Sequence, residues 1–161
     1  MDTMTLIVGL GCLIALLFGG VLLFGAPYLP TLRPQIDVAF ELLGLKPGQT
    51  LLELGCGDGK VLVAAAEAGF EVVGIELNPV LAGLAWLRTR KYKGKVRVLW
   101  GNFWSCKWPE SDGVFVFMMD RFMAGLGKRM AAYGGPVASV AFKMPDKKPA
   151  QEKDGVFLYE Y

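Results

Sequence analysis

Apolar residues gather in short runs that alternate with segments of helical spacing along most of the chain. The runs that predict strands end at Leu52 and then occupy residues 72–76, 95–100, 113–119, 137–142 and 156–161. The segments that predict helices occupy residues 34–43, 61–68, 79–90 and 122–133. Residues 144–154 are charged and contain proline, so we expect a loop there. Strands that alternate with helices predict an α/β, Rossmann-like, doubly wound domain whose mostly parallel sheet has about six strands.

A long uncharged segment precedes this domain. Residues 3–32 contain no charged side chain, and the dense apolar stretch 4–24 would span about 31 Å as a helix, close to the hydrocarbon thickness of a bilayer. A cleaved signal peptide would need a basic residue before the run, and a core helix would need a polar face. We therefore predict a transmembrane anchor within residues 1–26, a proline-rich connector at residues 27–34 and a domain at residues 35–161.

The flanking charges predict the orientation of this anchor. Asp2 lies before the apolar stretch, whereas Arg33 and Lys46 lie after it. The positive-inside rule then places the domain in the cytoplasm and the N-terminus on the other side. We expect a single-pass membrane protein that has the bilayer as a partner.

Composition excludes some kinds of chemistry. Histidine is absent and the three cysteines form no C-x-x-C pair, so no metal site and no His-based catalytic triad are expected. A formal net charge of +2 says little about partners, but residues 88–97 contain six lysines and arginines. Such a run is either a solvated helix end and strand edge or a surface for anionic lipid headgroups or an acidic partner.

The main chemical motif follows the first apolar run. Residues 53–59 read Glu-Leu-Gly-Cys-Gly-Asp-Gly and lie between a predicted strand and a predicted helix. Glycine has no Cβ, so a ligand can approach the backbone of such a turn and the N-terminus of the helix behind it. The turn is therefore predicted to bind a ligand, and Cys56 is a small residue that fits a tight loop.

Two acidic residues indicate which ligand this is. Glu53 precedes the first glycine, where it would repel a pyrophosphate but suit the α-ammonium of an amino acid. Glu76 ends the next predicted strand, where its carboxylate can accept hydrogen bonds from both hydroxyls of a ribose. An ammonium, a ribose and no phosphate fit S-adenosylmethionine. A nucleotide-binding domain without methyl transfer is the alternative.

Residues 46–79 resemble the first two motifs of the seven-strand S-adenosylmethionine-dependent methyltransferases. The match consists of a turn, an acid, three glycines and a second acid, in order within one βαβ-sized stretch. The resemblance implies cofactor contacts from Thr31, Glu53, Gly55, Cys56, Gly57, Asp58, Gly59, Glu76, Leu77, Asn102 and Phe103.

The order of anchor, connector, short helix and glycine motif is similar to that of the membrane-anchored protein-lysine methyltransferases of mitochondria, which modify the c-ring protein of ATP synthase and the adenine nucleotide translocase, and of their prokaryotic relatives. This resemblance implies lysine methylation of a membrane-associated protein. A small-molecule or lipid methyltransferase stays open, as does the oligomeric state. No Asn-Pro-Pro-Tyr segment follows the fourth predicted strand, and no nucleic-acid partner is expected.

Asp120 is the candidate catalytic residue. It follows the fourth predicted strand at the edge where the acceptor would dock, and its carboxylate could orient a lysine amine. Its alternative roles are pairing with Arg121 or capping the next helix. Asn102 stands where the family often has aspartate, and its amide oxygen can still accept a hydrogen bond from an adenine amino group.

Overall fold

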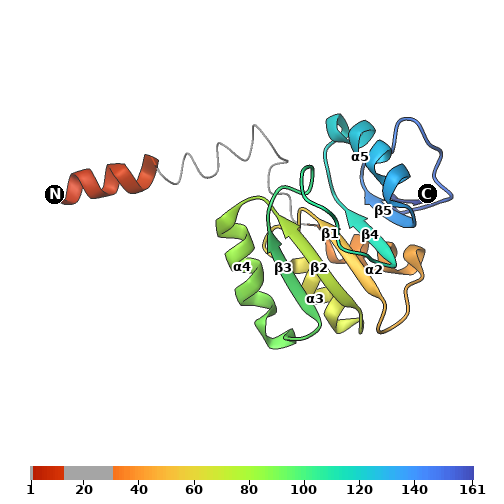
Figure 1. Cartoon of the computed structure of the whole chain (residues 1–161), viewed down its shortest axis with the longest axis horizontal. Coiled ribbons are helices and arrows are strands. Elements are labelled where there is room, and N and C mark those ends of the chain that lie inside the picture. The colour runs from red at the N-terminus through yellow and green to blue at the C-terminus, as the bar shows by residue number, and fades with distance from the viewer. Residues whose placement is uncertain (1, 13–30) are drawn as a thin grey trace.

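The computed structural model describes residues 2–12 and 31–161 (Figure 1). Residues 3–12 are helical, and Asp2 accepts a hydrogen bond of 2.9 Å from the Thr5 backbone at the start of this helix. Residues 13–24 of the predicted transmembrane helix lie outside the described residues. Within the described ranges, no helix combines the length and apolar character needed to cross a membrane.

The domain is built on one sheet of seven strands in the order β3-β2-β1-β4-β5-β7-β6. The strands are β1 Thr50–Leu54, β2 Glu71–Glu76, β3 Val96–Trp100, β4 Gly113–Val116, β5 Pro136–Val140, β6 Gln151–Lys153 and β7 Val156–Glu160. The first five are parallel, whereas β7 runs antiparallel to both β5 and β6. The strand order reverses between β1 and β4, and ligands of such sheets bind at the carboxyl ends of the strands beside this point.

Helices cover both faces of the sheet. They are α2 Arg33–Leu43, α3 Lys60–Glu67, α4 Pro79–Thr89 with the 3-10 turn Arg90–Tyr92, and α5 Asp120–Tyr133. The helices α2, α3 and α4 pack on one face, and α5 packs on the other. In Figure 1, β3 and α4 lie at one end of the domain, while α5 and β5 lie at the other.

Alternation along the strands explains why both faces are apolar. Leu51 packs beneath α2 and α3, whereas Leu52 and Leu54 point to the opposite face beneath α5. Successive strand residues point to opposite sides, so a strand buried on both faces reads as a continuous apolar run. The predicted α/β fold with a mostly parallel sheet is thus confirmed.

The predicted strand count was wrong. We expected about six strands and a loop at residues 144–154, but β6 forms within that segment and pairs with β7 through the Asp154-Gly155 turn. Asp154 and Gly155 both have positive φ, 49° and 75°, as a tight two-residue hairpin turn requires. All three residues of β6 are exposed, so this edge strand carries no apolar alternation that could reveal it.

Replacing Gly74 with alanine is expected to destabilise the domain. A Cβ at Gly74 would lie 2.7 Å from Cys56 Sγ and 2.8 Å from Cys56 Cβ, and such overpacking costs about 1 to 3 kcal/mol. Gly83→Ala in α4 is the matched control, because a Cβ there meets no atom within 4 Å. Urea unfolding should show a lower free energy of unfolding for Gly74→Ala only. Equal stability of the two variants would contradict the packing described here.

Candidate functional site

The glycine loop, residues 55–59, connects β1 to α3. Gly55, Gly57 and Gly59 have φ values of 79°, 53° and 81°, which side chains with a Cβ rarely adopt. A Cβ at Gly55 would meet no atom within 4 Å, whereas one at Gly59 would lie 3.0 Å from Ala85 of α4. Gly55 therefore leaves open space for a ligand, while Gly59 permits α4 to pack closely against the loop.

Glu76 ties this loop to the end of β2. Its Oε2 accepts a hydrogen bond of 2.8 Å from the Gly57 backbone N–H, and its Oε1 accepts one of 2.7 Å from the Asn78 backbone N–H. The side chain is 6% exposed. Each carboxylate oxygen can accept a second hydrogen bond, so acceptor capacity for two hydroxyls remains. The predicted ribose role of Glu76 fits this geometry and stays a prediction.

Glu53 is a buried acceptor beside the same loop. Its side chain is 4% exposed, and Oε2 has no hydrogen-bond partner among the described residues. Burial raises the pKa of Glu53 well above its usual range, and the charges of Glu76 and Asp58 raise it further. An ammonium group would supply both the missing donor and the missing countercharge. The residues present therefore fit the amino-acid end of S-adenosylmethionine.

Cys56 lies within this group of carboxylates. Burial, followed by the charges of Glu53 and Glu76, raises the pKa of its thiol far above the ordinary range. The thiol is therefore neutral and a poor nucleophile. Its close approach to Gly74 agrees with the interpretation of Cys56 as a small residue in a tight loop.

A second loop closes the site after β3. The Asn102 side-chain oxygen accepts a hydrogen bond of 2.9 Å from the Trp104 backbone N–H, so it stabilises its own turn. Arg129 of α5 donates to the carbonyl oxygens of Trp104 and Cys106 and lies 4.6 Å from the centre of the Trp108 ring. Gly101 N–H donates to the Glu76 carbonyl oxygen at 2.9 Å, which brings this loop beside Glu76.

The other predicted residues take different places. Asp58 pairs with Arg88, and the Leu77 carbonyl accepts a hydrogen bond of 3.0 Å from Trp100 Nε1. Thr31 is buried and lines a pocket on the helical side, whereas Phe103 is half-buried and packs 4.9 Å, centre to centre, from the Trp104 ring.

Asp120 does not cap α5. It is exposed and is the first residue of the helix, whose N-cap residue is Met119, so the capping alternative was wrong. Asp120 nevertheless lies just beyond the carboxyl end of β4, the strand next to β1. Its catalytic role stays a prediction.

Two positioning residues were missed by the sequence analysis. Asn78 holds Glu76 through its backbone N–H and caps α4, because its Oδ1 accepts hydrogen bonds from Val80 N and Leu81 N at 2.9 and 3.3 Å. Asparagine followed by proline is a helix-start signal that could have revealed this role. Arg129 gave no such signal, because its partners lie 23 and 25 residues away in sequence.

Comparisons with known proteins agree with this geometry. The sequence profile of the ANTKMT methyltransferase domain matches residues 53–151, a range that contains the glycine loop, Glu76 and Asp120. The chain therefore belongs to the ANTKMT methyltransferase domain family. The predictions of a methyltransferase fold and of S-adenosylmethionine as its cofactor are confirmed at the level of the family.

Individual relatives include two lysine methyltransferases. The lysine N-methyltransferase of the ATP synthase C protein from Rattus norvegicus is 28% identical over 143 residues, 83% of this chain and 66% of the relative. The adenine nucleotide translocase lysine N-methyltransferase of Mus musculus is 28% identical over 144 residues, 83% of this chain and 62% of the relative. The chain thus spans less than two thirds of the length of these relatives.

One solved structure covers most of the fold. The RNA methyltransferase of Salinibacter ruber, in complex with S-adenosyl-L-homocysteine, superposes with a TM-score of 0.74 at 26% identity, over 83% of this chain and 92% of that chain.

Glu53→Gln is expected to stabilise the ligand-free protein but weaken cofactor binding. A raised pKa means that the folded state binds more protons than the unfolded state above about pH 4.3, so the free energy of unfolding falls as pH rises through this range. The amide removes that loss, which we expect to raise stability at pH 7 by about 1 kcal/mol, or roughly 2 to 4 °C in Tm. Calorimetric scans and titrations with S-adenosylmethionine measure both effects. Glu71→Gln, an exposed carboxyl on β2, should change neither, and a Glu53→Gln protein that binds normally would refute the ammonium contact.

Glu76→Gln should weaken binding of S-adenosyl-L-homocysteine by about 1 to 3 kcal/mol, because the amide nitrogen cannot accept hydrogen bonds from hydroxyls. A double-mutant cycle separates this role from loop support: the variant and a ligand lacking the ribose 2′-hydroxyl are combined, and binding is measured by calorimetry. Coupling of at least about 1 kcal/mol is expected for a direct contact. Additive losses would mean that Glu76 only holds the loop.

Proposed function

We propose that the chain is an S-adenosylmethionine-dependent protein-lysine N-methyltransferase that acts on a membrane-associated protein. The observation that carries the proposal is the family match over residues 53–151. The names of the rat and mouse relatives support lysine as the acceptor and membrane proteins as the substrates. The buried carboxylate of Glu53 and the bonded carboxylate of Glu76 support the cofactor.

The cofactor would be held by the glycine loop, by Glu53 at its ammonium and by Glu76 at its ribose. Asn102, Phe103, Leu77 and Thr31 complete the proposed set of contacts. When bound, S-adenosylmethionine supplies a methyl group on a sulfonium, ready for in-line displacement. The protein's task is to align the acceptor nitrogen and exclude water, which can account for much of the rate.

The acceptor amine must reach this edge in its neutral form. A free lysine has a pKa of about 10.4, so one proton has to leave before transfer, and burial of the amine favours that loss. Asp120 lies exposed beyond β4, at the edge where the strands end, and its carboxylate would orient the amine through a hydrogen bond.

We further propose that residues 1–26 anchor the protein in the membrane as a single transmembrane helix, with the domain in the cytoplasm. The support is the uncharged run of residues 3–32 and the flanking charges of Asp2, Arg33 and Lys46. The connector, residues 27–34, reaches at most about 28 Å. The tether keeps the domain near the bilayer and raises the effective concentration of membrane acceptors.

The test is to identify where the methyl group goes. Membranes that contain the full-length protein are given S-adenosylmethionine with a labelled methyl group, and we expect base-stable label in a protein band. Label that extracts into organic solvent would show a lipid acceptor, and label released by ribonuclease would show an RNA acceptor. Either result overturns the lysine proposal. Glu76→Gln is the control with impaired cofactor binding, and deletion of residues 4–24 should slow labelling of membrane proteins more than labelling of a soluble lysine peptide.

A further inference from the structure

The helix α4 buries small side chains and exposes large apolar ones. Ala82, Ala85 and Thr89 are at most 6% exposed and face the domain. The exposed set consists of Val80, Leu84, Trp86 and Leu87, with 41%, 48%, 62% and 51% of their surface accessible. A helix that is apolar all round is normally covered on every side, so the outer side of α4 calls for a partner.

Packing explains why the small residues face inward. A Cβ at Gly59 would lie 3.0 Å from Ala85, so α4 crosses the glycine loop too closely for a larger residue at position 85. Val80, Leu84 and Leu87 are spaced by four and three residues, which places them in one stripe along the helix. The large residues are therefore displayed together rather than scattered.

This apolar stripe extends to the edge of the sheet. Trp100 at the end of β3 is 72% exposed, and its Nε1 donates a hydrogen bond of 3.0 Å to the carbonyl of Leu77, just before α4. We use the term α4 face for Val80, Leu84, Trp86, Leu87 and Trp100. Tryptophan is enriched where an apolar phase meets water, because its ring is apolar and its N–H is polar.

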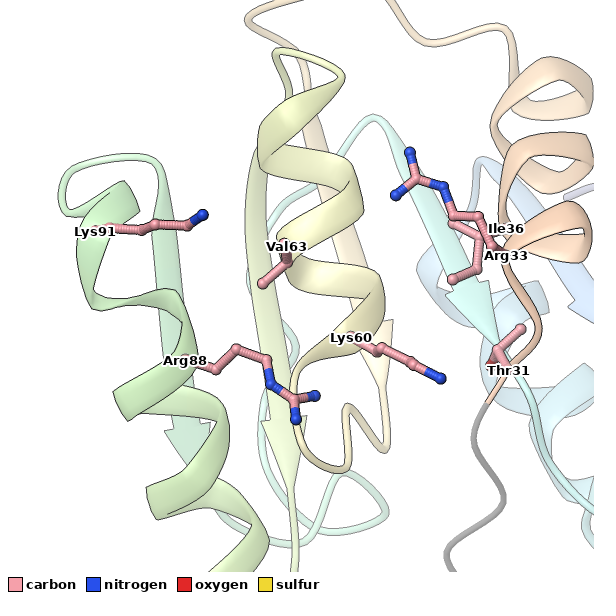
Figure 2. Close-up of a pocket in the computed structure, with 7 residues that line it drawn as sticks. All are labelled: Thr31, Arg33, Ile36, Lys60, Val63, Arg88 and Lys91. Carbon is pink, nitrogen blue, oxygen red and sulfur yellow. The ribbon is translucent and has the colours of Figure 1, made fainter.

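A basic groove lies next to the α4 face. It runs between α2, α3 and α4, has a volume of about 380 Å³, and is lined by Thr31, Arg33, Ile36, Lys60, Val63, Arg88 and Lys91. Figure 2 shows Lys60 and Arg88 reaching from α3 and α4 into the space between the helices, with Arg33 on the α2 side. Arg88 pairs with Asp58, and Arg33 lies 3.0 Å from Asp37 and 3.6 Å from Glu67. Exposed Arg90, Lys93 and Lys95 extend the positive charge beyond the groove.

We propose that the α4 face and the basic groove lie against an anionic lipid bilayer. An apolar stripe with tryptophan and adjoining basic residues is the composition of a helix that lies in the membrane interface. The cations add attraction to anionic headgroups, and this attraction falls off within about 8 Å at 0.15 M salt. The uncharged run of residues 3–32 also ends here, since Thr31 lines the groove and Leu32 is 64% exposed.

The consequence is a defined orientation of the domain. Helix α4 begins directly after β2 ends, at the sheet edge that also carries the glycine loop. A bilayer against α4 would therefore hold this edge at headgroup level. The inference goes beyond the proposed function, because it concerns the position of the domain and holds for any methyl acceptor.

Tryptophan quenching in vesicles tests the contact without any methyl transfer. The full-length protein is reconstituted into phosphatidylcholine vesicles with brominated acyl chains, with or without about 30% phosphatidylglycerol, the anionic component. Trp86 and Trp100 are exposed, whereas Trp108 is 5% exposed, so we expect quenching of the outer tryptophans. Quenching should be at least about twofold stronger with the anionic lipid and should decrease in 0.5 M salt.

Paired variants decide between the bilayer and other occupants. Leu84→Glu with Leu87→Glu should abolish the anionic-lipid quenching, whereas Ala124→Glu with Ala131→Glu, at exposed positions of α5, should leave it unchanged. If the first pair fails to fold by circular dichroism, Arg90→Glu with Lys93→Glu replaces it and should remove the dependence on anionic lipid. Quenching that is indifferent to lipid charge, or that survives both α4-side pairs, overturns the proposal. A dimer in light scattering that the leucine variants dissociate, with no lipid quenching, would assign the α4 face to a second copy of the chain.

Discussion

The hydrogen bonds that fasten the glycine loop to the end of β2 are the constraint on which the site depends. The backbone N–H groups of Gly55 and Cys56 donate to the Ile75 carbonyl at 2.9 and 3.1 Å, and Gly57 donates to the Glu76 carboxylate. These bonds join two neighbouring strands at their carboxyl ends, so the loop is rigid before any ligand arrives. The loop in turn sets how closely α4 can pack, through Gly59 and Ala85. Cofactor binding and the shape of the outer helical surface thus originate in the same turn.

The same turn concentrates negative charge at a cost in stability. Glu53 is buried, and the nearby charges of Glu76 and Asp58 raise its pKa beyond the effect of burial. Asp58 is offset by Arg88, and Glu76 by two backbone N–H groups, but Oε2 of Glu53 has no such partner among the described residues. A fold selected for stability alone would place an apolar side chain there. The retained carboxylate is best understood as a group that waits for a cation.

How much could be predicted from the sequence depended on how local each signal is. The strand, glycine loop and second acid were predictable because their meaning lies in short spacings along one βαβ unit. The strand β6 was missed because an exposed edge of Gln151, Glu152 and Lys153 has no apolar side to bury. The orientation of α4 was also not predictable: Val80, Leu84 and Leu87 have the spacing of a core stripe, yet they are exposed, because the close crossing at Gly59 admits only small residues. Both failures concern tertiary neighbours that no local pattern records.

A small domain of this kind also has to close the second face of its sheet economically. Between β3 and β4 the chain forms no helix, and the segment 101–112 lies there as a loop whose carbonyl groups need donors. Arg129 supplies two of them from α5 and packs against Trp108, which is 5% exposed and donates through Nε1 to the Phe103 carbonyl at 2.7 Å. One guanidinium and one indole thus do what a covering helix would otherwise do. Since the described residues build no separate domain for an acceptor, selectivity must come from the sheet edge itself and from what holds that edge in place, and this is why the outer surface of α4 matters to the chemistry.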